Sequence, residues 1–159
     1  MQRLILTKGL PASGKSTYAY ELVKLGWQRV NRDDIRWMMN DYHFSKKNEK
    51  IVTKVRDEAI HAALSAGCNV VVDETSLNPR IEADTKGLLE NFQAVEFEIN
   101  DSFLEVPPEV CINRDFLRAR PVGPSVIINM AVKAGLVDDI GRLRLESLAR
   151  NLKAYYNAL

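Results

Sequence analysis

The sequence has few of the residues on which disulfide-rich and metal-binding proteins depend. Its two cysteines, Cys68 and Cys111, lie in apolar surroundings and show no C-x-x-C or other metal-ligand spacing. This pattern excludes a disulfide scaffold and a zinc finger, and it indicates a protein of a reducing compartment. We expect both cysteines to be core residues of the fold. The two histidines, His43 and His61, stand apart from other ligand residues, so we expect both at the surface.

The sequence also lacks an excess of charge and any long apolar run. Its 22 Lys and Arg residues against 21 Asp and Glu give a net charge of +1, which excludes a polycation that coats any nucleic acid. A basic site must therefore be local. No signal segment and no apolar run of about 18 residues precedes the first predicted strand, so we expect a soluble, cytoplasmic protein with no membrane partner. The 159 residues are expected to form a single domain, 1–159.

Two of the eight glycines belong to a G-x-x-x-x-G-K-[ST] motif at residues 9–16. The motif follows a strand-like apolar run at 4–7 and precedes a helix-forming segment, which is the context of a phosphate-binding P-loop. Its glycines allow a tight turn whose backbone N–H groups point at nucleotide phosphates; the alternative is an ordinary Gly-rich turn. As a P-loop, the segment is expected to bind ATP through Gly9, Ser13, Gly14, Lys15, Ser16 and Thr17. Lys15 would act in catalysis through its charge on the transferred phosphate, and Ser16 would be a Mg²⁺ ligand.

Apolar runs alternate with helical segments along the chain, which is typical of a parallel sheet with helical crossovers. The predicted strands are 3–8, 28–31, 69–73 and 94–99, and the predicted helices are 15–25, 47–66, one starting at 78, 108–118, 124–134 and 139–158. The helix at 47–66 is expected to turn one apolar face inward, made of Ile51, Val55, Ala59, Ala62 and Ala63. The expected fold is α/β, a P-loop NTPase fold with a parallel sheet of about four strands flanked by helices and a C-terminal helical lid region.

Charged residues follow the second predicted strand, at 31–36. Open α/β sheets bind ligands at the carboxyl ends of their strands, so Asp33 would lie beside the P-loop and could accept a proton from an attacking hydroxyl. Arg36 could hold an anionic group of the substrate by a two-pronged hydrogen bond. The alternative is that Asp33 or Asp34 caps a following helix.

Two further acidic residues, Asp73 and Glu74, end the valine-rich strand at 69–73. P-loop proteins keep an acidic residue for Mg²⁺ at this position, which makes Asp73 a candidate metal ligand and both residues candidates for substrate binding. The alternative is an ordinary turn.

Three arginines, Arg114, Arg118 and Arg120, precede Pro121 and Gly123. Arg114 and Arg118 are expected to share a helix face, and with Arg120 on the following turn they could bind ATP and neutralise transition-state charge. The Pro/Gly interruption is what a mobile lid needs. The alternative is a solvated surface.

With these segments the chain resembles the kinase domain of the phage polynucleotide 5′-hydroxyl kinase family. The matching segments are 4–7 with the P-loop, Asn31-Arg32-Asp33-Asp34 with Arg36, Thr75-x-Leu77-Asn78-Pro79, and Arg114-x-x-x-Arg118. The resemblance implies transfer of the ATP γ-phosphate to a 5′-hydroxyl end of DNA or RNA, in the host cytoplasm if a phage encodes the protein. It implies that Asp33 is the general base, that Arg36 binds the phosphate 3′ to the reacting sugar, and that Arg118 is the lid arginine.

The sequence departs from the family pattern in two features, and two other functions remain alternatives. The sequence has no D-x-D-G-T phosphatase motif, so no 3′-phosphatase activity is expected, and the family's acidic residue could be Asp73 or Glu74. A related kinase could phosphorylate another hydroxyl, on a modified base in DNA or on a small molecule such as a nucleoside. A GTP-dependent switch needs an N-K-x-D motif late in the chain, whereas Asp84-x-x-Gly87 and Asp138-x-x-Gly141 fall in or beside predicted helices. The sequence does not determine the oligomeric state.

Overall fold

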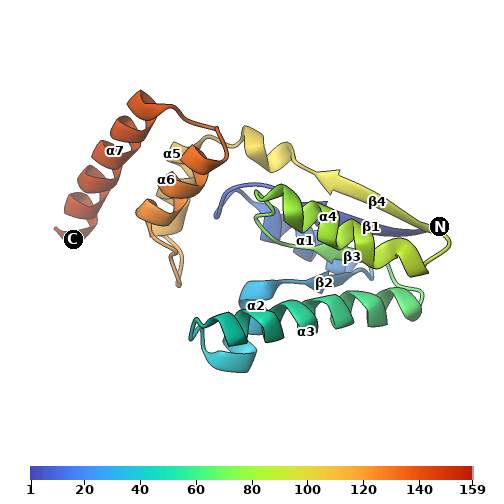
Figure 1. The fold of residues 1–159 in the computed structure, drawn as a ribbon. Coiled ribbons are helices and arrows are strands. Elements are labelled where there is room, and N and C mark those ends of the chain that lie inside the picture. The colour runs from blue at the N-terminus through green and yellow to red at the C-terminus, as the bar shows by residue number, and fades with distance from the viewer. Residues whose placement is uncertain (159) are drawn as a thin grey trace.

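A computed structural model describes residues 1–158 of the chain as an α/β domain with a helical group at one end (Figure 1). The strands are β1 (Gln2–Thr7), β2 (Gln28–Val30), β3 (Val70–Val72) and β4 (Val95–Asn100). The α-helices are α1 (Lys15–Lys24), α2 (Arg32–Asn40), α3 (Lys46–Ser65), α4 (Pro79–Gly87), α5 (Pro108–Phe116), α6 (Pro124–Lys133) and α7 (Asp139–Asn157), with 3-10 turns η1 (Leu88–Asn91) and η2 (Ser102–Glu105). The predicted α/β fold is confirmed, and most predicted boundaries lie within one or two residues of these.

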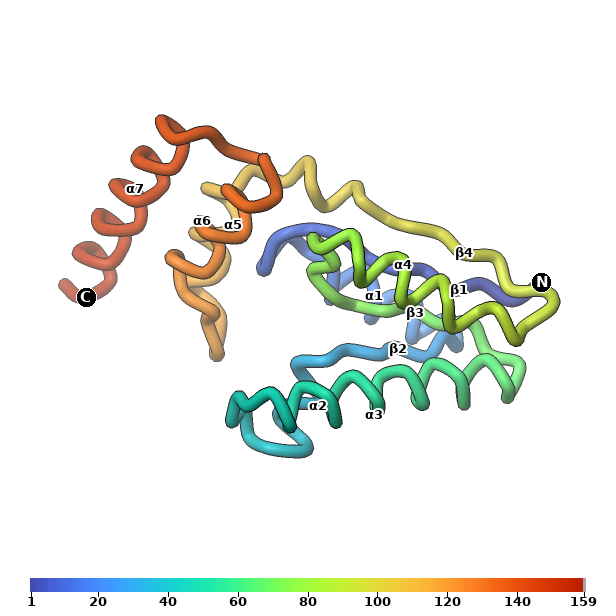
Figure 2. Tube along the Cα trace, in the orientation of Figure 1, coloured from blue at the N-terminus to red at the C-terminus, as the bar shows by residue number. Residues whose placement is uncertain are grey.

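All strand pairs are parallel, in the order β2-β3-β1-β4. Successive strand residues face opposite sides of a sheet, so both faces of these apolar strands are covered. Leu4 and Leu6 of β1 pack with α3 and with the segment after α4, whereas Ile5 packs with Ala19 of α1 and with Trp27. The parallel pairing brings the carboxyl ends of β1, β2 and β3 to one edge, which faces the α5–α7 group (Figure 2).

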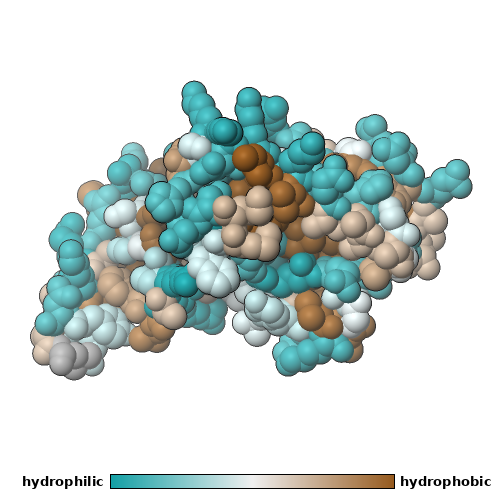
Figure 3. Space-filling view, turned by 90° about the horizontal axis from the view of Figure 1, so that it is seen from below, coloured by the Kyte–Doolittle hydropathy of each residue, from teal (hydrophilic) through white to brown (hydrophobic). Residues whose placement is uncertain are grey.

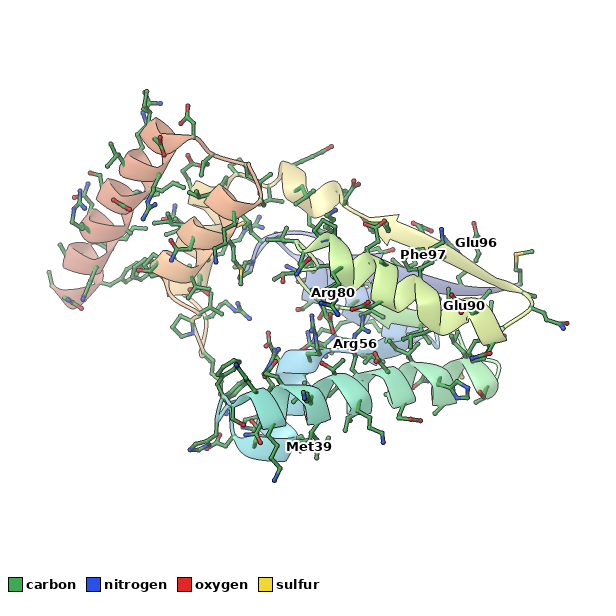
Figure 4. All side chains as sticks on the ribbon, in the orientation of Figure 1. Met39, Arg56, Arg80, Glu90, Glu96 and Phe97 are labelled. Atoms are coloured by element: carbon green, nitrogen blue, oxygen red, sulfur yellow. The ribbon has the colours of Figure 1, made fainter. Side chains whose placement is uncertain are left out.

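The buried face of α3 differs from the predicted one. The residues that the structure buries are Val52, Arg56, Ile60 and Leu64, spaced four apart, while Ile51 is 39% exposed and Ala62 is also exposed. Val55, Ala59 and Ala63 are partly buried beside that row, as expected. The prediction failed because an arginine stands in the middle of the apolar row; Arg56 rises from α3 toward α4 (Figure 4) and is only 3% exposed.

The C-terminal helices pack around a second core that includes Leu10 of the P-loop and Cys111 of α5. Burial raises the pKa of the Cys111 thiol, as expected of a core cysteine, but Cys68 is only half-buried, so the prediction that both lie in the core is wrong for Cys68. Both histidines are exposed, as predicted. No helix within residues 1–158 is long and apolar enough to cross a membrane.

Candidate active site

The P-loop is fixed to the end of β3 by its first glycine. The Gly9 N–H donates to the Thr75 carbonyl at 2.9 Å, and a side chain on Gly9 would collide with Phe103, whose Cβ would lie 2.6 Å away. Gly14 has a φ of 106°, a left-handed conformation that glycine adopts without strain, and it stands at the N-cap position just before α1. The loop therefore directs backbone N–H groups and the positive end of α1 at one point, which is an anion site.

Lys15, the first residue of α1, is buried against the loop. Its ammonium donates to the carbonyl oxygens of Gly9 at 3.0 Å and Leu10 at 2.5 Å. Burial lowers the pKa of Lys15 to about 8, against the opposing attraction of the Asp73 carboxylate. The lysine thus carries a poorly solvated charge, for which an added phosphate would be a strong partner.

Asp73 is 1% exposed and is held by the neighbouring strand β2. Arg29 donates to its Oδ2 from Nε at 2.8 Å and approaches the same atom with Nη2 at 2.7 Å. The Thr7 hydroxyl ties β1 to the same strand end through the Val72 and Glu74 carbonyls, at 3.2 and 3.0 Å. The strand order therefore positions the Asp73 carboxylate beside the P-loop.

Glu74 sits in a buried ion-pair network on the other side of that strand end. Arg56 donates from Nε to its Oε1 at 3.1 Å and from Nη2 to the Thr85 hydroxyl at 2.5 Å, while Arg32 Nη2 lies 2.8 Å from Oε2. A buried charge is tolerated when it is paired, and this network joins α2, α3 and α4 to the sheet edge. Of the two acidic candidates, Glu74 is thus the one held on both oxygens by arginines.

Asp33 and Arg36 face each other one turn apart on α2. Asn31 caps this helix by accepting the Asp34 N–H at 3.0 Å, so neither aspartate is the cap, although both lie in the first turn. Arg36 Nη1 donates to Asp33 at 2.6 Å, and its Nε and Nη2 donate to the two oxygens of Glu49 at 2.8 Å each. The two hydrogen bonds that Arg36 donates to Glu49 raise the pKa of Arg36, and the same bonds lower the pKa of Glu49.

The arginine segment after α5 departs from the predicted helix. The helix ends at Phe116, so Arg118 lies on a turn rather than on one helix face with Arg114. The buried Asp115 fixes that turn by accepting the N–H groups of Val122 at 3.1 Å and Gly123 at 2.9 Å. Arg118 itself makes a 3.4 Å contact with Asp115 and keeps 45% of its side chain exposed.

Replacing Asp115 by alanine should therefore lower the free energy of unfolding by about 2 kcal/mol, because two backbone N–H groups lose a charged acceptor. Urea denaturation measures this. Asp101→Ala is the matched control, since that exposed aspartate makes no side-chain cap hydrogen bond and its loss should stay within about 0.5 kcal/mol. Equal unfolding midpoints for Asp115→Ala and the unmutated chain would show that the turn does not depend on this carboxylate.

Two adjoining cavities connect these groups. One of about 660 Å³ runs along the P-loop and α1, and its wall includes Gly14, Lys15, Ser16, Thr17, Arg114 and Arg118. A second of about 360 Å³ lies at the sheet edge, and its wall includes Lys15, Ser16, Asp33, Arg36, Asp73, Glu74 and Arg118. The structure thus brings together most of the residues predicted from the sequence. Arg120 lines neither of these two cavities and instead lies over the rings of Trp37 and Tyr42.

The sheet edge offers oxygen ligands that suit Mg²⁺. This ion takes oxygen donors and is usually held by one or two protein groups together with substrate phosphates and water. The Ser16 hydroxyl and the Asp73 carboxylate both line the cavity at the sheet edge, and Arg29 engages only one oxygen of Asp73. Residues 1–158 contain no group of three or more His, Cys, Asp and Glu side chains placed to hold a metal. The donors present fit an ion held jointly with nucleotide phosphates.

Several residues that build the site were not predicted from the sequence. They are partners that orient the predicted groups: Arg29, Glu49, Arg56 and Asp115. Asn31 and Arg32 are part of a sequence motif, but their roles as helix cap and as partner of Glu74 were not predicted. Arg56 had a detectable signal, because a charged residue in an apolar series of spacing four indicates a buried ion pair. Arg29 and Glu49 act through contacts between segments distant in sequence, and Asp115 acts through a turn outside the helical pattern; spacing reveals neither.

A P-loop after the first strand of a parallel sheet, with an acidic residue at the end of the adjacent strand, is the arrangement of P-loop kinases. The chain belongs to the AAA domain family, whose sequence model matches residues 4–136.

The relatives include nucleic-acid enzymes. A protein of Autographa californica nuclear polyhedrosis virus whose name describes a bifunctional polynucleotide kinase/RNA ligase is 30% identical over 146 residues, 79% of this chain and 20% of that protein. A chain of a Pnkp1/Rnl/Hen1 complex is 31% identical with a TM-score of 0.60, over 71% of this chain and 39% of that one. A chain of the Pnkp1/Rnl/Hen1 RNA repair complex is 25% identical with a TM-score of 0.64, over 99% and 46%. The chain therefore spans less than half the length of these relatives.

A kinase of a small molecule shares the fold. A gluconokinase from Sinorhizobium meliloti 1021 has a TM-score of 0.51 over 98% of this chain and 97% of its own, at 18% identity. At that identity the likeness shows the fold alone.

Proposed function

We propose that this chain is a polynucleotide 5′-hydroxyl kinase, which transfers the γ-phosphate of ATP to the 5′-hydroxyl end of DNA or RNA. The observation that carries the proposal is the cavity at the sheet edge, where Lys15 and Ser16 of the P-loop meet Asp33 and Arg36 of α2. A phosphate donor and a hydroxyl acceptor can therefore meet in one space. The relatives at 30% and 31% identity support a nucleic-acid acceptor.

The donor would occupy the cavity along α1. Its β- and γ-phosphates would bind the N–H groups of the P-loop, with Lys15 and Arg118 on the transferred group, and Arg114 toward the nucleoside. Bound Mg²⁺ would neutralise phosphate charge, held by the Ser16 hydroxyl and by Asp73. Because the phosphoryl transition state spreads charge over its oxygens, these cations and N–H groups supply most of the catalysis.

The acceptor would occupy the cavity at the sheet edge, with its 5′-hydroxyl at Asp33. That carboxylate is exposed and carries one contact, from Arg36, so it can accept the hydroxyl proton as the oxygen attacks. The Arg36 guanidinium, with a planar set of donors, would bind the phosphate on the 3′ side of the reacting sugar. Asp33 and Arg36 then act on neighbouring groups of one nucleotide.

The alternative is a small-molecule kinase, which would use Lys15, Ser16 and Asp33 but would not need Arg36 to bind a phosphate of the acceptor. Incubation with labelled ATP, Mg²⁺ and single acceptors separates the two. The acceptors are a 5′-hydroxyl oligonucleotide, a nucleoside 3′-monophosphate, a free nucleoside, a base-hydroxymethylated duplex and gluconate. Label on the first two supports the proposal, and label confined to any of the other three contradicts it.

The Arg36→Lys variant tests the acceptor side of the site. We expect it to lose about tenfold or more in kcat/KM with oligonucleotides and nucleoside 3′-monophosphates, because a lysine cannot form the two-pronged hydrogen bond. The KM for ATP should hardly change. The control is Arg142→Lys on α7, whose exposed guanidinium contacts Glu146 away from both cavities. A nucleoside without a 3′-phosphate should be a poor acceptor already; equal use of nucleosides and their 3′-phosphates would contradict the role of Arg36.

A further inference from the structure

Helix α2 and the turn that follows it each present an aromatic ring beside the proposed acceptor site. Trp37 and Tyr42 keep 52% and 45% of their surface exposed. This side of the molecule, around α2 and α3, shows exposed apolar side chains among hydrophilic ones (Figure 3). The exposed part of each ring is available to a ligand.

The turn after α2 fixes the position of Tyr42. Asp41 and Tyr42 both have a positive φ, 46° and 61°, which is uncommon for residues other than glycine. The Tyr42 N–H donates to the carbonyl of Arg36 at 3.4 Å, and Asn48 of α3 donates to the His43 carbonyl at 2.6 Å. Local strain of this kind is kept where the surroundings fix it, and here it places Tyr42 next to the residue proposed to bind the acceptor phosphate.

The side chain of Arg120 lies over both rings. Its guanidinium carbon is 5.1 Å from the centre of the Trp37 ring and 5.9 Å from that of Tyr42. A third cavity, of about 560 Å³, connects this place with the reaction site, since its wall includes Ser16, Asp33, Tyr42, Arg118 and Arg120. A strand whose 5′ end lies at Asp33 would therefore leave the site past Tyr42 and Arg120.

We propose that Trp37, Tyr42 and Arg120 form a stacking site for a base of a single-stranded acceptor, one that lies on the 3′ side of the reacting nucleotide. The inference rests on the proposed function and adds a second contact region to it. Bases stack on aromatic rings and on guanidinium planes irrespective of sequence, so the site would favour single strands without reading their bases. Arg120 would take part in binding the acceptor rather than ATP.

Acceptors that differ only in the presence of later bases test this site. We compare a 5′-hydroxyl trinucleotide, the same trinucleotide with abasic second and third positions, and a nucleoside 3′-monophosphate. The unmutated chain should use the intact trinucleotide about tenfold better than the abasic one in kcat/KM. Trp37→Ala and Tyr42→Ala should each remove most of that advantage and leave the nucleoside 3′-monophosphate unaffected. Trp37→Phe should keep it, and Phe44→Ala, a 79% exposed aromatic on the same turn, should behave as the unmutated chain does.

Tryptophan fluorescence gives a readout independent of activity. The other tryptophan, Trp27, is only 9% exposed, so quenching by the intact trinucleotide without ATP should come from Trp37 and vanish in Trp37→Phe. Equal use of the intact and abasic trinucleotides overturns the stacking site while leaving the kinase proposal in place. An equal loss on all three acceptors in Trp37→Ala also overturns it, because the ring then only supports the turn. Label on none of these acceptors overturns both proposals.

Discussion

Lys15→Ala should lower the rate of phosphoryl transfer by at least about 100-fold, because it removes the cation placed on the transferred phosphate. Single-turnover transfer from labelled ATP measures the loss. The matched control is Lys24→Ala at the other end of α1, an exposed lysine that contacts only Glu21 and should leave the rate unchanged. Near-normal transfer by Lys15→Ala would contradict the assignment of the P-loop.

The buried charge of Lys15 should also make the free energy of unfolding depend on pH. Its pKa in the folded chain is lowered to about 8 by burial, below the ordinary value of 10.5. Between these two values the unfolded chain binds more protons, so the Lys15 contribution to the free energy of unfolding rises with pH from about 8 to about 10.5. Relative to Lys15→Met, the unmutated chain without nucleotide should therefore be less stable at pH 7 and should recover toward pH 10.5. If the difference in the free energy of unfolding between the two chains did not change with pH, burial would not lower the pKa of Lys15.

Asp33→Asn should lower single-turnover transfer by about 100-fold or more while ATP still binds, because an amide cannot accept the hydroxyl proton. The neighbouring Asp34→Asn is the comparison. That carboxylate contacts Arg29 on β2, so its loss should act mainly on stability and cost less activity. If Asp34→Asn abolished transfer and Asp33→Asn did not, the two roles would be exchanged. Equilibrium binding of ATP to both variants separates a loss of chemistry from a loss of binding.

The local chemistry of the site could be predicted from the sequence because it lies in contiguous segments. The P-loop is one stretch of eight residues, Asp73 directly follows β3, and Asp33 lies in the first turn of the helix that follows β2. In a parallel sheet, strand ends meet at one edge whatever the strand order, so their proximity follows from the fold class alone. The cavity at the sheet edge confirms that proximity.

The pairing of charges could not be predicted in the same way. Arg29 contacts Asp73 because β2 lies beside β3, and Glu49 contacts Arg36 because the start of α3 packs on α2. These contacts join segments separated by loops whose path the sequence pattern does not predict. The end of α5 at Phe116 was missed for a related reason: the turn after it is fixed by Asp115 and Gly123, a contact outside the helical pattern.

The ion pairs of Arg36 determine how an anion could bind there. Its guanidinium already donates to both Glu49 and Asp33, so protein carboxylates balance its charge. An acceptor phosphate that binds Arg36 would displace one of these carboxylates. Because one anion replaces another, binding of the phosphate would release few salt ions, and its affinity would depend weakly on ionic strength. If the exchanged partner is Asp33, the arrival of the phosphate frees the carboxylate that accepts the hydroxyl proton. Binding of the acceptor and exposure of the base would then be a single event.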